Sequence, residues 1–269
     1  MTQPEVIRRN GLVIDQYTPD HPTDLPPMVI MHGLFGSRDN WRSQARALAA
    51  DRIVYVPDMP NHGDSIHTDD ISYRSLAETM WQSFPEESLI LLGHSMGGKV
   101  AMTMALSNPE RCSALIVADI APRTYPPRHD EIFAGMRAVE TAQPKSRREG
   151  EEVLAAHIPE RDIRLFLLKS LTPVDDQTGG TSGYRWKLNI AGLIANYAEI
   201  SRWTDPGTTC HERTLQIRGG KSPYVTDDDL EHMAQLFPAL QVETISEAGH
   251  WLHAEAREHF LAVVRRFIS

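Results

Sequence analysis

Residues 89–106 read LILLGHSMGGKVAMTMAL, an apolar strand pattern that passes directly into a helix pattern. The junction, Gly93 to Gly97, fits G-x-S-x-G. A sharp strand-to-helix turn would lift the hydroxyl of Ser95 above a sheet, and flanking glycines avoid clashes with such a backbone. The helix N-terminus that follows supplies free N–H groups and positive partial charge. The stretch therefore predicts a serine nucleophile rather than a turn with an incidental serine.

The residues around this stretch predict an α/β fold. Short apolar runs suited to strands covered on both faces occupy 27–32, 52–58, 88–93 and 113–121. Helical patterns lie between them, at 40–50, 73–84 and 99–106. This alternation predicts a mostly parallel, doubly wound sheet, whose ligands bind beyond the carboxyl ends of the strands.

The alternation stops at residue 123. Four helical and polar segments follow without a strand-like run, and "TPVDDQTGGTSG" (172–183) has the composition of a turn. Strand patterns resume at 213–220 and 240–249, and a closing helix is expected over 254–268. We therefore predict a core formed by 1–122 and 207–269, with a helical cap inserted at 123–206.

Composition narrows the classes of partner. The formal net charge is −9 and the pI is about 5.7, which argues against nucleic acids and anionic membranes as partners. The two cysteines, Cys112 and Cys210, form no disulfide framework or zinc pattern and are expected to be buried. Neither a signal peptide nor a long apolar run is present, which predicts a cytoplasmic protein.

A loop suited to oxyanion binding follows the first of these predicted strands. His32-Gly33 comes directly after it, and Gly36 closes the loop. Small residues let a main-chain N–H approach a developing oxyanion, and the donor is Leu34 or Phe35, with Leu34 favoured. The second expected donor is the N–H of Met96. His32 is expected to order the loop by hydrogen bonding.

A candidate general base lies late in the chain, in "SEAGHWLHAE" (246–255). His250 follows the last predicted strand through Ala248-Gly249. His253 competes for this role but is expected to start the closing helix. The H-x-x-H spacing is an improbable metal site because no further ligands accompany it. His94, beside the nucleophile, is expected to point away from the cleft.

Taken together, "HGLFGSRDNW", "PDMPNHGDS", "GHSMGGKVAM", "VADIAP", "RHDEIF" and "AGHWLHAE" resemble the α/β-hydrolase superfamily over nearly the whole chain. More narrowly, they resemble small cytosolic bacterial esterases and acyl-thioesterases that have mitochondrial relatives. The resemblance implies a serine hydrolase acting on carboxylic esters or thioesters without a cofactor. It also implies that Asp58 belongs to the scaffold.

The acid of the triad is missing from its usual place. Most α/β-hydrolases carry an aspartate where this chain reads Gly219-Gly220-Lys221-Ser222-Pro223. One replacement is Asp119, at the end of the strand next to the nucleophile strand, about 4.8 Å away. Another is the cluster 227–229, although Thr226 and Asp229 have the spacing of a helix capping box. Asp119 is favoured, and a site without a functional acid is the third alternative.

The cap offers candidate substrate contacts. Its large apolar residues are either acyl-pocket residues or helix-packing core: Phe133, Met136, Trp186, Leu193 and Tyr197. Its basic residues either meet an anionic acyl carrier or form a solvated face: Arg123, Arg128, Lys145, Arg147 and Arg148. Convergent arginines in the cleft would favour a non-hydrolytic reaction, such as elimination or retro-addition. A ligand-binding protein without activity is a third possibility, which the serine, histidine and oxyanion loop disfavour.

Overall fold

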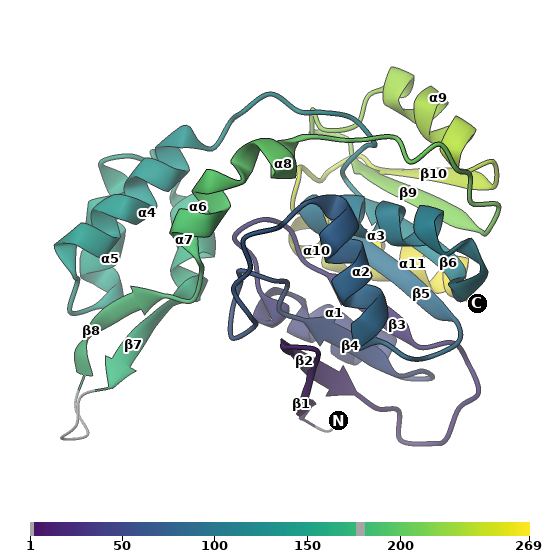
Figure 1. Ribbon diagram of the computed structural model, residues 1–269, viewed down its shortest axis with the longest axis horizontal. Coiled ribbons are helices and arrows are strands. Elements are labelled where there is room, and N and C mark those ends of the chain that lie inside the picture. The colour runs from purple at the N-terminus through teal and green to yellow at the C-terminus, as the bar shows by residue number, and fades with distance from the viewer. Residues whose placement is uncertain (1–2, 176–180) are drawn as a thin grey trace.

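An eight-stranded, mostly parallel sheet forms the centre of the molecule (Figure 1). The computed structural model describes residues 3–175 and 181–269. The strand order is β1-β2-β4-β3-β5-β6-β9-β10, and the six strands from β4 to β10 pair in parallel. The strands are β1 (Glu5–Arg9), β2 (Leu12–Tyr17), β3 (Met28–Met31), β4 (Val54–Pro57), β5 (Leu89–His94), β6 (Cys112–Ala118), β9 (Thr214–Gly219) and β10 (Leu240–Ile245). The predicted fold class is confirmed.

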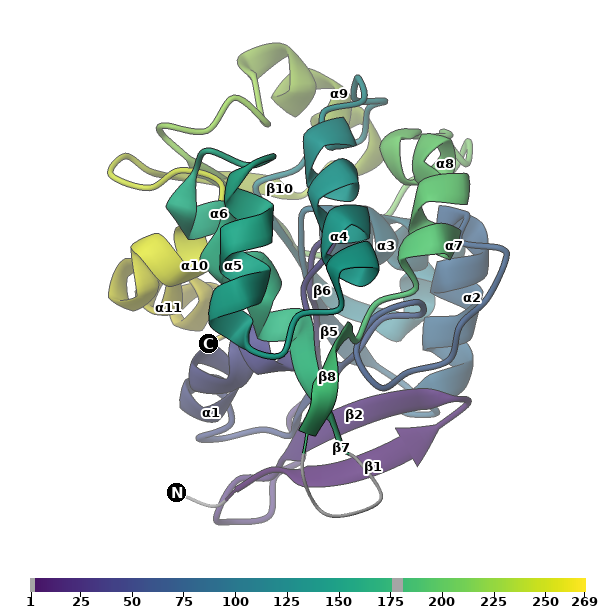
Figure 2. The same cartoon turned by 90° about the vertical axis from the view of Figure 1, so that its left-hand side faces the viewer.

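Helices cover both faces of this sheet (Figures 1 and 2). One apolar cluster joins one face to α2, α3 and α9, and a second joins the other face to α1 and α11. Alternate residues of one strand divide between the clusters, as Leu91 and Leu92 do, which explains the continuous apolar runs. These helices and turns are η1 (Arg38–Trp41), α1 (Arg42–Leu48), α2 (Tyr73–Ser83), α3 (Met96–Ser107), η2 (Pro109–Arg111), α9 (Asp227–Leu236), α10 (Leu252–Glu255) and α11 (Arg257–Ile268).

Two features of the core differ from prediction. The antiparallel hairpin β1–β2 is not among the predicted strands: β1 is a polar, exposed edge strand without an apolar run, and the apolar run of β2 is only three residues long, Leu12 to Ile14. The predicted closing helix is two helices, α10 and α11, separated at Ala256, whose φ of −129° is not helical. Cys112 and Cys210 are buried free thiols, as predicted.

The chain between β6 and β9 forms a cap beside the core (Figures 1 and 2). Its elements are α4 (Asp130–Ala142), α5 (Arg147–Ala155), α6 (Arg161–Leu167), η3 (Leu168–Ser170), β7 (Leu171–Asp175), β8 (Thr181–Trp186), α7 (Ile190–Ala195) and α8 (Tyr197–Ser201). The cap is mainly helical, as predicted, but the expectation that no strand interrupts it is wrong, since β7 and β8 pair as an antiparallel ribbon. The predicted turn at 172–183 is strand where it is described, and its residues 176–180 lie outside the described part.

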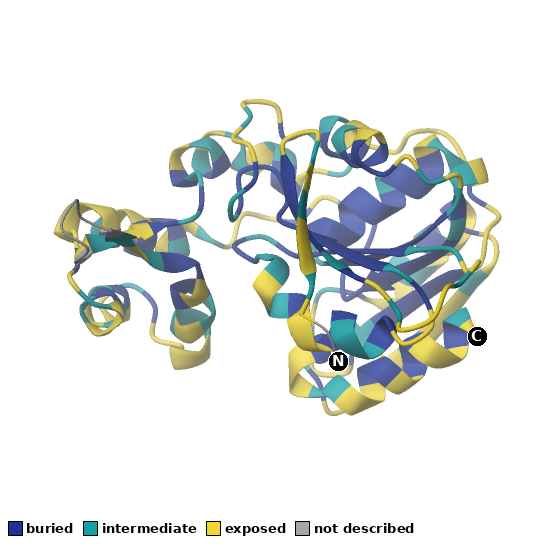
Figure 3. Ribbon diagram, turned by 90° about the horizontal axis from the view of Figure 1, so that it is seen from below, coloured by how far each residue is buried: buried dark blue, intermediate teal, exposed yellow. Residues whose placement is uncertain are grey.

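The two linkers that join the cap to the core contact each other. The amide of Tyr125 in the entering linker donates to the carbonyl of Ser201 at the start of the leaving one, at 2.9 Å. Burial is densest in the sheet and its inner helix faces, and a smaller buried core lies inside the cap (Figure 3). The predicted cap boundaries, residues 123 and 206, lie in or next to these linkers and stay predictions. No helix in the described ranges is long and apolar enough to cross a membrane.

Candidate active site

Ser95 occupies a strained turn between β5 and α3. Its φ of 54° and ψ of −123° are rarely adopted by residues other than glycine, and α3 begins with the next residue, Met96. The turn is so tight that a Cβ on Gly93 would collide with the carbonyl oxygen of Gly97. The predicted strand–turn–helix geometry around Ser95 is therefore confirmed.

Asp119 lies beside His250, at the carboxyl end of β6. Its Oδ2 accepts a hydrogen bond from Nδ1 of His250 at 2.7 Å, and its Oδ1 accepts one from the amide of Gly219 at 2.9 Å. The carboxyl group is fully buried, and the backbone at Asp119 has a φ of 53°, which aspartate tolerates better than most residues. Of the candidate acids, Asp119 is the one that the fold places against the histidine.

Ser222 stands at the tip of β9, where the acid was expected from the resemblance. Its hydroxyl donates a hydrogen bond to Oδ2 of Asp119, the same oxygen that accepts from His250. The side chain at this position therefore still reaches the catalytic carboxylate candidate. It contributes a donor rather than a charge.

The acidic cluster at 227–229 has other partners. Thr226 and Asp229 form a reciprocal capping box at the start of α9, as predicted. Asp229 also pairs with Arg123 at 2.9 Å, and Asp227 pairs with Arg218 at 2.7 Å. Helix capping and these ion pairs account for the cluster, and none of its described contacts is with the histidine.

The loop that carries His250 is held from two sides. The ring of Tyr224 stacks on the His250 ring at 4.0 Å between centroids. On the other side, Nε2 of His94 lies 2.8 Å from the carbonyl oxygen of His250. Burial lowers the pKa of His94 well below its usual value, so the ring is neutral and donates its Nε2 proton to that carbonyl. The expectation that His94 points away is wrong, because its ring packs against His250 and lines the cavity.

His253 lies behind this loop. It belongs to α10 and stacks on Trp41, with 4.3 Å between ring centroids and 11° between ring planes. Burial lowers the pKa of His253 to about 3. Because its neutral ring packs against Trp41 rather than against a carboxylate, His250 remains the better candidate base.

The hydrogen bonds of the loop after β3 distinguish its two candidate oxyanion donors, Leu34 and Phe35. The amide of Phe35 donates to Nε2 of His62 at 3.2 Å, while Nδ1 of His62 lies 2.9 Å from the carbonyl of Pro60. The Pro60 carbonyl takes the ring proton on Nδ1, so Nε2 can accept, and burial lowers the pKa of His62 to about 3. The amide of Phe35 is therefore occupied, whereas the amides of Leu34 and Met96 have no hydrogen-bond acceptor among the described residues. This arrangement favours Leu34 over Phe35 as a donor.

His32 and Asp58 brace this loop, as predicted. Nε2 of His32 accepts from the amide of Met59 at 3.0 Å, and its Nδ1 donates to the carbonyl of Gly33 at 2.8 Å. Asp58 accepts from the amide of Arg38 at 2.9 Å and pairs with its guanidinium. Neither side chain contacts Ser95, so both have scaffold roles.

Two cavities meet at Ser95. The larger, of about 360 Å³, opens between core and cap, and Ser95 and His250 both line it. No hydrogen bond joins these two side chains within the described residues, and such contacts often tighten only when substrate binds. The smaller cavity, of about 50 Å³, extends from Ser95 beneath the cap linkers and is called here the inner chamber.

The cap residues that line these cavities differ from those predicted. Of the five apolar candidates, only Tyr197 lines either cavity, while Phe133, Met136, Trp186 and Leu193 are buried in packing. In the larger cavity the cap instead contributes Ile132 of α4 and Ile163, Phe166 and Leu167 of α6, which the sequence pattern did not single out, while Tyr224 and Trp251 come from loops of the core. The helical spacing of these four cap residues is typical of packing as well as of lining, so no signal in the sequence separates them from the predicted set.

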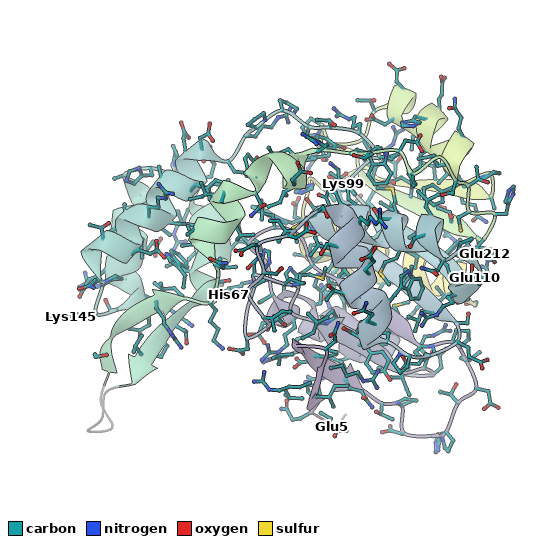
Figure 4. All side chains as sticks on the ribbon, in the orientation of Figure 1. Glu5, His67, Lys99, Glu110, Lys145 and Glu212 are labelled. Carbon is teal, nitrogen blue, oxygen red and sulfur yellow. The ribbon has the colours of Figure 1, made fainter. Side chains whose placement is uncertain are left out.

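Of the five basic candidates, Arg128 alone lines the cavities. Arg123 pairs with Asp229, and Arg148 pairs with Glu152. Arg147 donates to the carbonyl of Leu171 at 3.1 Å, and Lys145 lies at the far side of the cap (Figure 4). The convergent arginines that would favour a non-hydrolytic reaction are thus not found in the described cleft.

Residues 26–256 match the model of the family described as alpha/beta hydrolase fold. The chain belongs to this family. This α/β-hydrolase is 35% identical to sn-1-specific diacylglycerol lipase ABHD11 of Mus musculus, over 93% of its own length and 83% of the relative. It is 34% identical to esterase YbfF of Escherichia coli strain K12, over 90% of its length and 93% of the relative. The resemblance to this family and its esterases is confirmed, and the chain is a hydrolase.

A solved structure supports the same grouping. A marine microorganism esterase is 36% identical to this α/β-hydrolase and superposes with a TM-score of 0.87, covering 95% of this chain and 98% of the esterase. Because that superposition spans both core and cap, the cap belongs to the shared architecture.

Proposed function

We propose that this hydrolase cleaves carboxylic esters through an acyl-enzyme at Ser95, with His250 as general base and Asp119 as the acid of the triad. The observation that carries the proposal is the 2.7 Å hydrogen bond between Asp119 and His250. His250 and Ser95 line the same cavity. Its relatives include a lipase and esterases, which supports an ester as the substrate.

The chemistry follows from these roles. His250 takes the hydroxyl proton of Ser95 through Nε2 as the oxygen attacks the acyl carbonyl, and later gives it to the leaving alcohol. Asp119 holds the ring with Nδ1 protonated and stabilises the imidazolium. The amides of Leu34 and Met96 bind the oxyanion. Water then attacks the acyl-enzyme by the same route, so the products are a carboxylic acid and an alcohol.

Acyl thioesters are included in the proposal as a second substrate class. The same residues would cleave them, since thiolates leave more readily than alkoxides. Rates on one acyl group carried as an oxygen ester and as a thioester compare the two classes directly.

A fluorophosphonate probe tests the nucleophile. We expect the protein to be labelled covalently and the label to be absent from Ser95→Ala, as intact-protein mass spectrometry would show. Ser222→Ala is the matched control, because it removes a hydroxyl that contacts Asp119 but is not the proposed nucleophile. Labelling that survives in Ser95→Ala, or no labelling of the folded protein, would show that the proposed nucleophile is wrong.

A further inference from the structure

Lys99 is a buried cation close to the proposed nucleophile that the mechanism above does not use. It lies on α3, one helical turn after Ser95, where the linker from α8 crosses the helix (Figures 1 and 4). Its exposed fraction is 1%, and it lines the inner chamber together with Ser95. Because both residues line this chamber, the Lys99 side chain and the nucleophile face the same space.

The partners of the Lys99 ammonium are neutral. Its Nζ donates to the carbonyls of Ser201 and Arg202, each at 3.0 Å, and lies 5.3 Å and 4.9 Å from the ring centroids of Tyr73 and Tyr125. No carboxylate within the described residues pairs with it. An ammonium has three donor hydrogens, so these two bonds leave one free.

A buried charge without a counter-ion is costly. Burial first, and then the Arg123 guanidinium, lower the pKa of Lys99 to about 7. Two carbonyls and two aromatic faces offset part of this cost. An anion in the inner chamber would offset the remainder, and Ser201, Tyr73 and Tyr125, which surround Nζ, all line that chamber.

The dimensions of the chamber limit what could supply this anion. Its volume of about 50 Å³ holds roughly four water-sized groups. Ser95 and the groups that surround the Lys99 ammonium line this same small space. A short acyl chain bound covalently to Ser95 could therefore bring a distal carboxylate to the ammonium, whereas a long chain has room only in the larger cavity.

We propose that Lys99 is a specificity-determining residue that binds a distal carboxylate on short acyl groups, so that half-esters of short dicarboxylic acids are preferred substrates. The inference rests on the proposed ester hydrolysis at Ser95. Hydrolysis of such a half-ester by water gives the dicarboxylic acid and the alcohol. The carboxylate takes no part in bond making.

Two isosteric esters test this preference. Monoethyl succinate carries a carboxylate where ethyl 4-methylpentanoate carries an isopropyl group of similar shape. We expect kcat/KM at pH 6.5 to be roughly 10- to 100-fold higher for the anionic ester, the range of a hydrogen bond to a charged group. A ratio of one or below in the wild-type protein would overturn the proposal. Failure to hydrolyse these two esters and p-nitrophenyl esters of short and long acyl chains would instead overturn the proposed function.

Variants separate charge from packing. Lys99→Met keeps the length of the side chain without its charge, and we expect the anionic-to-neutral ratio to fall to about one. Thr124→Val removes the acceptor of the Trp203 amide, at 3.0 Å, which also holds the leaving linker, but keeps the ammonium and the residues that line the chamber. It should keep the wild-type ratio. If Lys99→Met keeps the high ratio, or if Thr124→Val loses it to the same extent, Lys99 only anchors the linker and the inference is wrong.

Discussion

A single carboxylate oxygen organises the proposed triad at the scale of individual residues. Oδ2 of Asp119 accepts from both His250 and Ser222, and Oδ1 accepts from the backbone of Gly219. The three donors fix the carboxylate while one of its oxygens faces the imidazole. A buried carboxylate with these contacts can stabilise an imidazolium without reorganising as it forms.

Replacing Asp119 by asparagine tests this assignment. The change keeps the shape of the side chain but removes its charge and allows the wrong tautomer of His250. We expect kcat to fall by up to about 10⁴-fold. Steady-state hydrolysis of a p-nitrophenyl ester measures the loss, and circular dichroism checks that the variant folds.

Asp227→Asn is the matched control for that substitution. Asp227 lies in the first turn of α9, and its largely exposed side chain pairs with Arg218. Its loss should cost stability of about 1 kcal/mol or less and leave kcat near the wild-type value. A large loss of kcat in Asp227→Asn together with a small loss in Asp119→Asn would reverse the assignment.

Some of the site's features could be predicted from the sequence, and others could not. The turn around Ser95 and the scaffold role of His32 follow from local pattern, because glycines and strand ends fix them within a few residues. The choice between Leu34 and Phe35 depends on His62, which lies 27 residues from Phe35 in the chain. The position of His94 likewise depends on a loop 156 residues away. Such long-range partners leave no local signal.

At the scale of elements, β6 and β9 are neighbours whose tips share one site. They pair in parallel, with Ala118 opposite Ile217, so Asp119 and the residues after Gly219 end at the same edge of the sheet. The acid can stand on either tip while the histidine loop stays in place. This adjacency explains why the absence of an acidic side chain at position 222 predicts an acid at position 119.

The adjacency predicts that the acid can be moved back. In the double variant Asp119→Asn, Ser222→Asp, the new carboxylate would lie at position 222. The present side chain there already contacts Asp119, the residue that is hydrogen-bonded to His250. We expect kcat to recover at least about tenfold over Asp119→Asn alone. The recovery should be smaller with Ser222→Asn, which has the same shape without charge. Equal rates in the two double variants would contradict the idea that charge at this tip is what matters.

The ribbon β7–β8 and the strand β1, which escaped prediction, are short and polar, whereas β2 was missed although Leu12, Val13 and Ile14 are apolar and buried. The ribbon β7–β8 contains Pro173 and Gly183, and among those of its residues whose burial is described only Leu171 and Trp186 are buried. Pattern-based prediction detects apolar periodicity, which the six parallel strands have on both faces and this ribbon lacks. The same reasoning applies to β1, whose side chains are mainly exposed.

At the scale of the whole molecule, buried neutral histidines link stability to pH. Burial lowers the pKa of His32 to about 4 and those of His62 and His253 to about 3. An unfolded chain protonates these groups near pH 6.5, so it binds more protons than the folded protein below that pH. Their contribution is fully present above about pH 6.5 and is lost as the pH falls toward the folded-state values.

Urea unfolding between pH 7 and pH 5 measures this dependence. We expect the free energy of unfolding to fall with acidification, with each such histidine adding up to about 1.4 kcal/mol per pH unit. His253→Phe, which keeps an aromatic ring against Trp41 but cannot titrate, should flatten the slope. His67→Gln, at an exposed position, should not. The same slope in wild type and His253→Phe would show that this imidazole does not titrate as inferred.

The position of the cap in the chain has a consequence for synthesis. With the roles proposed above, nucleophile, acid and both oxyanion donors lie before the cap, whereas His250 follows Asp119 by 131 residues. The ribosome therefore produces Ser95 well before the base that would activate it, and before β9, which completes the surroundings of the acid. Because His250 is synthesised after the cap, Ser95 would stay unactivated until the cap is complete. A nascent chain that lacks the cap would therefore not be acylated at Ser95.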